Sequence, residues 1–310
     1  MRYLLVLTML FLLSCNDQKS IDSTGLTKVK LQLNWMPEAE HGGYYEALLK
    51  GYFKEEGLDV EIIPGGPGVR VETETALQRT QFGIANADKI LIVRGKEMKL
   101  TAILAPFENS PRCLIFHKDL GVKSFNDLTK AKVLILNNTK PFYHWLIKKY
   151  PELKNKDTIP YNKATFMSGK DAVIQGYINS EPLIFKDKGL DVNFLKVSDT
   201  EFNPYTSVLM CSDDYKKANP QIVEKIKKAS VKGWLSYLKN PSVTNDHIEK
   251  INPANKGTLD KSTEMMMELM SPQNEQFGQM TVERWKSLAG QLKEINLLDK
   301  IPEDIELFID

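Results

Sequence analysis

The chain has 310 residues, and its 41 Lys and Arg nearly balance its 40 Asp and Glu. An export signal would remove only Arg2 from these counts, which leaves 40 of each, and a chain without excess positive charge lacks the basic face that nucleic-acid phosphates require. We therefore expect no nucleic-acid partner, and the ~290 remaining residues are enough for a large core and two lobes.

The N-terminus has the layout of an export signal, with one positive charge at Arg2 and an apolar run from Leu4 to Leu13. This run is shorter than the ~20 apolar residues that span a membrane. The four residues that end at Cys15 resemble the lipobox of bacterial lipoproteins. We expect a signal peptide at residues 1–14, acyl chains on Cys15 that hold the protein to a membrane, and a polar tether at residues 15–28. A plain signal peptide with an incidental cysteine is the alternative.

Strand and helix patterns alternate from residue 29 onward. Val29, Leu31 and Leu33 alternate with polar residues and predict a half-buried strand. The following patterns predict helices at 44–54, 69–79 and 89–94, and strands at 58–63, 82–85 and 100–107. Strands that alternate with helices indicate a parallel sheet covered by helices.

The same alternation starts again near residue 112. It predicts strands at 113–117, 132–136 and 158–162, helices at 142–149 and 169–178, and short strands near Leu183 and Phe194. After residue 210 the pattern is helical, with the Asn-Pro pairs at 219–220, 240–241 and 252–253 as breaks. The fold class is therefore α/β with two units.

Specific motifs extend through nearly all of the chain after the tether. They read LQLNW at 31–35, HGG at 41–43, KGYFKEEGLDV at 50–60, QFGIA at 81–85, QGY at 175–177 and SEP at 180–182. These residues resemble the solute-binding proteins related to thiamine-pyrimidine and sulfonate receptors. The resemblance implies the two-lobed periplasmic binding protein fold of type II, with two hinge crossings near 106–114 and 205–210. Lobe 1 would comprise 29–110 and 207–310, lobe 2 would comprise 111–206, and the lobes would close on ligand.

An enzyme is the rival interpretation, because fungal thiamine-pyrimidine synthases share this fold. The synthases carry a lysine for pyridoxal phosphate after the strand that matches Gly83, where this chain has Ala85, and Lys89 stands where they have a reactive histidine. Their cysteine cluster for iron matches 202–206, which reads FNPYT here. We therefore expect no enzymatic activity, no cofactor and no metal site.

Candidate ligand-binding residues follow the strands of lobe 1, because ligands of open α/β sheets lie at the carboxyl ends of strands. Asn34, Trp35 and Glu38 follow the first strand, and the Trp35 indole can stack on a planar heterocycle. His41 can donate one hydrogen bond to a ligand, although a capping or buried histidine would look the same.

Two further candidate positions in lobe 1 have equally plausible structural explanations. Gly65 and Gly66 precede a helix, so their backbone amides can meet an acceptor, but a tight turn explains them equally well. Asp88 can accept from a ligand amine or cap the following helix.

In lobe 2 and at the crossings we expect six more ligand contacts. They are Asn137, Tyr143, Tyr177 and Glu181 in lobe 2, and Phe107 and Tyr205 at the crossings. The Glu181 carboxylate can accept two hydrogen bonds from an exocyclic amine and a protonated ring nitrogen, and a surface ion pair is the alternative.

These residue types predict a flat, nitrogen-rich ligand such as a thiamine pyrimidine of the formylaminopyrimidine type. Riboflavin is the nearest alternative, and Arg70 and Arg112 keep a sulfonate such as taurine open, since an anion would seek arginine. The resemblance implies a monomer outside the cytoplasm that delivers its ligand to the permease and ATPase subunits of an ABC importer. Cys113 and Cys211 would lie near the crossings, as free thiols or as one bridge.

Overall fold

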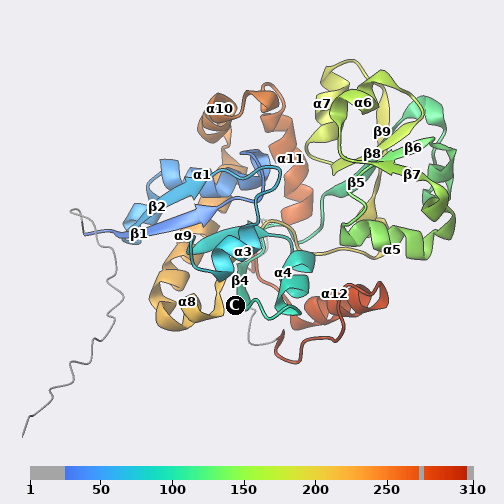
Figure 1. Ribbon diagram of the computed structural model, residues 1–310. Helices are drawn as coiled ribbons and strands as arrows, with labels where there is room; N and C mark the ends of the chain where they lie inside the picture. The colour runs from blue at the N-terminus through green and yellow to red at the C-terminus, as the bar shows by residue number, and fades with distance from the viewer. Residues whose placement is uncertain (1–24, 272–275, 306–310) are drawn as a thin grey trace, which may run out of the picture.

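The computed structural model describes residues 25–271 and 276–305, which form two lobes (Figure 1). Each lobe contains one five-stranded sheet with helices packed on it. The predicted signal peptide, Cys15 and the tether up to residue 24 lie outside the described residues. Within the described ranges, no helix is long and apolar enough to cross a membrane.

Lobe 1 is built on the sheet that the first half of the chain begins. Its strands, in the order β2-β1-β3-β10-β4, are β1 (Thr27–Gln32), β2 (Leu58–Ile63), β3 (Phe82–Ala85), β4 (Leu100–Leu104) and β10 (Val208–Ser212). The predicted strands are confirmed to within a few residues. Strand β1 begins at Thr27, two residues before the predicted start, because Thr27 pairs with Leu58. A tether would therefore end before residue 27 and be shorter than the predicted 15–28.

Nine α-helices and two 3₁₀ helices of the described residues accompany this sheet. They are η1 (Ala39–His41), α1 (Gly42–Leu49), α2 (Tyr52–Glu55), α3 (Val71–Ala76), α4 (Ala87–Arg94), α8 (Asp213–Ala218), α9 (Pro220–Lys239), α10 (Ser242–Ile251), η6 (Pro253–Asn255), α11 (Leu259–Met270) and α12 (Val282–Glu294). The single helix predicted at 44–54 is wrong, because Gly51, with a φ of 76°, separates α1 from α2. The predicted Asn-Pro breaks are confirmed, since α9 begins at Pro220 and α10 directly follows Pro241.

Lobe 2 carries the second sheet, in the order β7-β6-β8-β5-β9. Its elements are β5 (Arg112–His117), η2 (Lys118–Leu120), η3 (Phe125–Lys130), β6 (Val133–Ile135), α5 (Pro141–Lys149), η4 (Pro151–Asn155), β7 (Asp157–Ile159), α6 (Lys163–Ser168), β8 (Ala172–Tyr177), α7 (Glu181–Asp187), β9 (Val192–Lys196) and η5 (Val197–Thr200). The helix predicted at 169–178 is wrong, since most of it is β8. Ala172 to Ile174 form a short buried run, and such a run does not distinguish strand from helix. Leu183, predicted in a strand, lies in α7.

The two sheets share one plan, which confirms the two-lobed α/β architecture. Four strands of each sheet are parallel, and the strand that enters directly from the other lobe lies antiparallel between two of them. This strand is β10 in lobe 1, between β3 and β4, and β5 in lobe 2, between β8 and β9. Cys113 lies in β5 and Cys211 in β10, so both are buried in different sheets, and no disulfide joins them.

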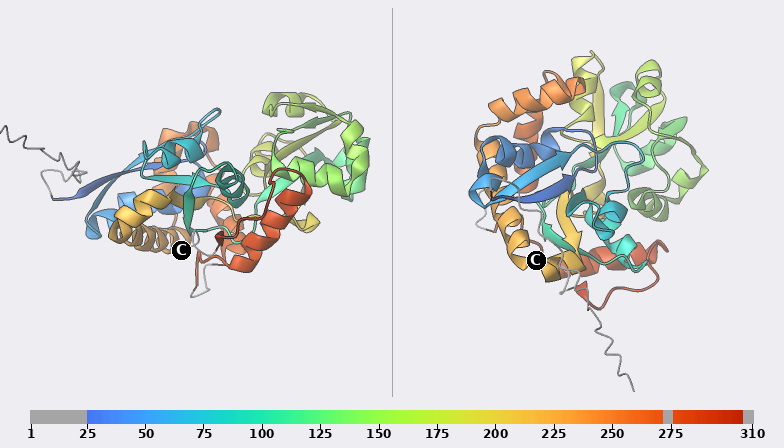
Figure 2. Two further views of the ribbon diagram at one scale, coloured as in Figure 1. Left: turned by 60° about the horizontal axis from the view of Figure 1, so that its bottom comes forward. Right: turned by 60° about the vertical axis from the view of Figure 1, so that its left-hand side comes forward.

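The chain passes between the lobes in two segments, 105–111 and 201–207, that are bonded to each other. The Asn203 amide nitrogen donates to the Asn109 side-chain oxygen over 2.9 Å. At the start of α12, Arg284 Nη2 donates to the backbone oxygens of Glu108 (2.6 Å) and Asn203 (3.0 Å). Helix α12 packs against α4 and runs beneath the junction of the lobes (Figure 2). Its first turn therefore holds the two crossing segments together.

Glycines bring α1 and α9 into close contact beneath the lobe 1 sheet. A Cβ on Gly43 would lie 2.1 Å from the Trp234 ring, and one on Gly233 would lie 2.3 Å from the backbone oxygen of Gly43. Trp234 is fully buried, so the ring has little room to move. This contact fixes the position of α1, which follows the loop that carries Trp35 and the short helix η1.

We predict that Gly43→Ala and Gly233→Ala each lower the free energy of unfolding by about 1–3 kcal/mol, because the added methyl overpacks the contact. Gly290→Ala in α12 is the matched control. Its Cβ would meet no atom within 4 Å, so it should stabilise the protein by about 0.5–1 kcal/mol through helix propensity. Denaturant unfolding measures all three variants. Equal effects at the three positions would contradict the close contact.

Candidate functional site

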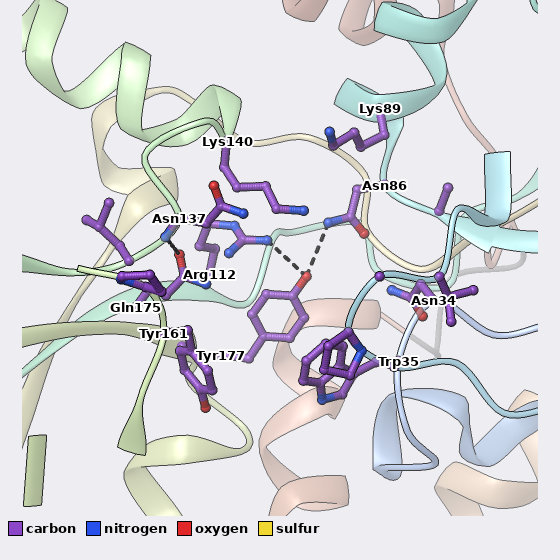
Figure 3. A pocket seen from close by; sticks show the side chains of 18 of the residues that line it. Asn34, Trp35, Asn86, Lys89, Arg112, Asn137, Lys140, Tyr161, Gln175 and Tyr177 are labelled. Carbon is purple, nitrogen blue, oxygen red and sulfur yellow. Dashed lines mark hydrogen bonds between the residues drawn. The ribbon is translucent and has the colours of Figure 1, made fainter. Parts of the chain in front are cut away.

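A cleft of about 780 Å³ lies between the two lobes. Its walls come from the carboxyl ends of parallel strands in both sheets, where open α/β sheets bind ligands. The loops after β1, β2 and β3 supply lobe 1 residues, and the loops after β6, β7 and β8 supply lobe 2 residues. The polar and aromatic residues of the lining include Asn34, Trp35, Glu38, Glu40, Asn86, Lys89, Arg112, Asn137, Lys140, Tyr161, Gln175, Tyr177, Ser180 and Glu181. Figure 3 shows Tyr177 at the centre of this group.

Trp35 is held at the cleft by the tight turn after β2. The Gly65 backbone N–H donates to the Trp35 backbone oxygen over 2.9 Å. A Cβ on Gly65 would lie 2.3 Å from the backbone oxygen of Leu33, so only glycine permits this approach. Gly65 therefore lies behind the wall, whereas Gly66 lines the cleft. The Trp35 side chain stays half-buried, with its ring available for stacking.

His41 lies fully buried behind the wall and orients Asn34. Its Nδ1 accepts from the Glu38 backbone N–H (3.3 Å), so Nε2 carries the proton and donates to Asn34 Oδ1 (2.8 Å). Burial lowers the pKa of His41 to about 3, which keeps the ring neutral. With its oxygen occupied, Asn34 offers its amide nitrogen to the cleft as a donor.

Three carboxyl groups of the lining, those of Glu38, Glu40 and Glu181, lie close enough to interact electrostatically. Burial, and then the Glu181 charge, raise the pKa of Glu38 to about 7, and Ser180 Oγ donates to Glu38 Oε2 across the lobes over 3.3 Å. Burial and the charges of the other two carboxylates hold the pKa of Glu40 well above its usual value. One Glu40 oxygen, Oε2, is buried without a hydrogen bond among the described residues. Such a group is suited to accept hydrogen bonds from an amino group or a protonated ring nitrogen.

Glu181 is already bonded on both oxygens. Tyr161 Oη donates to Oε1 over 2.6 Å, and the Tyr177 backbone N–H donates to Oε2 over 2.8 Å. Burial, together with the adjacent carboxylate, raises the pKa of the Tyr161 hydroxyl, so it remains a donor. The remaining lone pairs of Glu181 can still accept from a ligand.

The Tyr177 hydroxyl connects the two lobes at the middle of the cleft (Figure 3). It accepts from Asn86 Nδ2 of lobe 1 (3.2 Å) and from Arg112 Nη2 of lobe 2 (3.3 Å). The Arg112 guanidinium lies over the rings of Phe142 (4.8 Å) and Tyr177 (5.0 Å). With both bonds accepted, the Tyr177 proton is free to be donated into the cleft.

The structure brings seven of the thirteen predicted binding residues to the cleft. They are Asn34, Trp35, Glu38, Gly66, Asn137, Tyr177 and Glu181. His41 and Gly65 lie one layer behind, as described above. Asp88 is buried in the first turn of α4, where its Oδ1 accepts from the Lys89 backbone N–H, and the N-cap of this helix is Asn86 rather than Asp88.

Three predicted aromatic residues do not reach the lining. Phe107 is buried against Trp234, with ring centroids 6.3 Å apart. Tyr205 lies under the Arg284 guanidinium (3.9 Å) and fills the space between the crossing segments. Tyr143 is buried on α5. These three rings therefore pack in the interior and not at the surface of the cleft.

Several residues of the lining were not among the predicted contacts. They are Glu40, Asn86, Lys89, Arg112, Lys140, Tyr161 and Gln175. The sequence supported Arg112 only as a contact for the alternative ligand, a sulfonate. Asn86 and Tyr161 each follow a strand closely, a signal that could have identified them. Among the described residues, no group of three or more His, Cys, Asp or Glu side chains is arranged to hold a metal ion.

We predict that Glu38→Gln gains stability over the unmutated protein as pH rises from 4.5 to about 7. In this window folded Glu38 holds a proton that the unfolded chain, with an ordinary pKa of 4.5, has released, so ionisation costs stability as pH rises. Glutamine cannot ionise. The contribution of His41 to the free energy of unfolding changes with pH in the opposite direction. Because His41 is present in both proteins, this contribution cancels in the difference between them. Denaturant unfolding of both proteins across this pH range measures the effect, and parallel curves would contradict it.

Sequence comparison finds several known proteins that are similar to this chain. The formylaminopyrimidine-binding protein of Halalkalibacterium halodurans is 25% identical over 303 residues, which cover 93% of this chain and 91% of that protein. The riboflavin-binding protein RibY of Chloroflexus aurantiacus is 25% identical over 259 residues, 78% of this chain and 72% of that protein. A 4-amino-5-hydroxymethyl-2-methylpyrimidine phosphate synthase of Saccharomyces cerevisiae is 23% identical over 251 residues, 71% and 73% of the two chains.

A solved structure and a family model also match this chain. The periplasmic aliphatic sulphonate binding protein SsuA of Escherichia coli superposes with a TM-score of 0.66 at 12% identity, over 91% of this chain and 92% of that chain. This likeness establishes the periplasmic binding protein fold. The family model described as NMT1/THI5 like matches residues 38–244, well over half of the chain. The protein therefore belongs to the NMT1/THI5 like family.

Proposed function

We propose that this protein is the solute-binding component of an ABC importer and captures an amino-substituted heterocycle, such as a thiamine pyrimidine, between its lobes. The observation that carries the proposal is the half-buried Trp35 indole beside Glu38 and Glu40 in the interlobe cleft. A flat ring can stack on the indole, while its amino group and ring nitrogen donate to the carboxyl groups. The relative from H. halodurans, named for binding a formylaminopyrimidine, supports this ligand class.

The protein is proposed to act outside the cytoplasm, as a monomer held to a membrane by lipid on Cys15. The lipobox-like sequence before Cys15 and the preceding apolar run support this location. The expected partners are the permease and ATPase subunits of the importer. Lobe closure around the ligand would present the complex to them.

A binding role is favoured over synthase activity by two positions. Ala85, at the end of β3, lines the cleft where the resemblance would require a lysine, and its methyl group forms no imine. The segment 202–206, which would carry a cysteine cluster in a synthase, contains no cysteine and packs at the crossings. The yeast relative is also more distant than the binding proteins.

Riboflavin is the second candidate ligand, since one relative is named for binding it. The cleft of about 780 Å³ is within the usual range of ~300–1,000 Å³ for small-molecule sites and admits either ring system. The two ligands differ in the polar groups they present, because a flavin ring lacks the exocyclic amine that the carboxyl groups would accept from. Direct titration distinguishes them.

We predict that Trp35→Ala weakens pyrimidine binding on the order of tenfold to a hundredfold, because a base-sized ring loses its stacking partner. Trp35→Phe should retain part of the affinity. Isothermal titration calorimetry of the domain without its first 24 residues measures binding of aminopyrimidines, riboflavin and alkanesulfonates. Met36→Ala is the matched control, since Met36 is 45% exposed and lies outside the lining.

Met36→Ala should bind as the unmutated protein does. Tight binding of a sulfonate with no binding of any aminopyrimidine would overturn the proposed ligand. Binding of riboflavin alone would keep the importer role and replace the ligand. Equal loss of affinity in Trp35→Ala and Met36→Ala would remove the stacking argument.

A further inference from the structure

Two lysines line the part of the cleft that lies away from Trp35 (Figure 3). Lys89 comes from α4 of lobe 1 and Lys140 directly precedes α5 of lobe 2, and Arg112, at the start of β5, lines the cleft as well. Figure 3 shows the Lys140 side chain reaching toward Asn86 and Lys89 across the gap between the lobes. The cleft thus carries Glu38 and Glu40 on the segment after Trp35 and the two lysines away from Trp35, and the charge of Arg112 also acts on Glu40.

These cationic groups lack carboxylate partners. Among the described residues, Lys89, Lys140 and Arg112 each form no ion pair within 4 Å, whereas most lysines that pair do so on the outer surface. Burial, followed by the charges of Lys89 and Arg112, lowers the pKa of Lys140, and Asp88 and Glu72 offset only part of this. Like charges held together in a partly buried site favour a bound anion between them.

Amide donors surround the same space. Asn137 Oδ1 already accepts from the backbone N–H (3.0 Å) and the hydroxyl (2.7 Å) of Thr139, which leaves the amide nitrogen as the group Asn137 can offer. The Asn137 backbone N–H donates to Gln175 Oε1 (2.9 Å), so this loop is held in place. Asn86 is likewise oriented, since its Oδ1 accepts from the Ser207 backbone N–H (3.2 Å). Lysine ammonium groups and oriented amide donors together match an oxyanion.

We infer that the ligand has two ends: an amino-heterocycle on Trp35 beside Glu38 and Glu40, and an oxyanion, as in a phosphate monoester or a carboxylate, between Lys89 and Lys140. This inference rests on the proposed function and narrows it. A neutral aminopyrimidine would leave the basic end unmatched. A sulfonate without an amino group would leave the acidic end unmatched, because it has no donor for the carboxyl groups.

The test compares 4-amino-5-hydroxymethyl-2-methylpyrimidine with its phosphate monoester and with the analogue that carries a carboxymethyl group in place of the hydroxymethyl. Calorimetric titration of the domain from residue 25 gives the ratio of the affinities for the ester and the alcohol. We expect the ester to bind about tenfold tighter or more, as charge-assisted hydrogen bonds require. The ratio should shrink as salt rises from about 0.05 to 0.5 M. The carboxymethyl analogue shows whether phosphate or carboxylate is the better match.

Two lysine variants locate the effect. In Lys89→Met/Lys140→Met the ratio of ester to alcohol affinity should fall to near one, and Lys89→Arg/Lys140→Arg should restore part of it. Lys154→Met, an exposed lysine outside the cleft in lobe 2, is the matched control and should keep the full ratio. Thermal unfolding of each variant checks that it is folded.

Each outcome has one meaning. Equal affinities for the alcohol, the ester and the carboxymethyl analogue would overturn the two-ended ligand and leave the proposed importer role standing. Absence of binding by all three pyrimidines would overturn the proposed ligand class, on which this inference rests. A preference for the ester that persists in Lys89→Met/Lys140→Met, or that is lost in Lys154→Met, would overturn the assigned site.

Discussion

The placement of strands β5 and β10 is the constraint on which the rest of the structure depends. Each enters its sheet directly from the other lobe and lies antiparallel to its neighbours. The carboxyl ends of the remaining parallel strands are therefore directed toward the other lobe in both sheets, and their loops meet at one cleft. The short crossings, fastened by Arg284 and the Asn109–Asn203 hydrogen bond, limit how the lobes can move relative to one another. A hinge motion about these segments would open and close the cleft without disturbing either core.

The cleft owes its chemistry to buried ionisable groups whose hydrogen bonds and charges the protein leaves only partly compensated. Glu40 has a buried oxygen without a hydrogen bond, and Lys140 faces other cations. Leaving such groups without partners costs stability, and a ligand that supplies the missing donors and acceptors recovers that cost on binding. Tyr177 lies between the two ends, and its hydroxyl accepts hydrogen bonds from Asn86 of lobe 1 and Arg112 of lobe 2. The hydrogen bonds of this hydroxyl therefore depend on the relative position of the lobes as well as on the ligand. Specificity in this account comes from matching both ends at once.

The sequence predicted the architecture well and the site in part. Trp35 and Asn137 each follow a predicted strand, and strand ends meet at the cleft, whereas Tyr177 was predicted within a helix and is the last residue of β8. Lys89 and Lys140 were missed because a lysine facing a cleft and a lysine facing solvent have the same local pattern, and only the packing of the two lobes distinguishes them. His41 and Gly65 were predicted as ligand contacts but lie one layer behind the wall, a difference in depth that spacing along the chain does not contain. The error at β8 has a similar origin, since a short buried run carries no period.

Tryptophan fluorescence during titration with an aminopyrimidine tests the central claim most directly. Of the four tryptophans, Trp145, Trp234 and Trp285 are buried in the lobes, and only Trp35 lies half-buried at the cleft. A ring stacked on Trp35 should quench its emission in a saturable way, and Trp35→Phe should abolish the change. A saturable change that survives in Trp35→Phe, or calorimetric binding with no change in emission, would contradict a ligand stacked on Trp35 between the lobes.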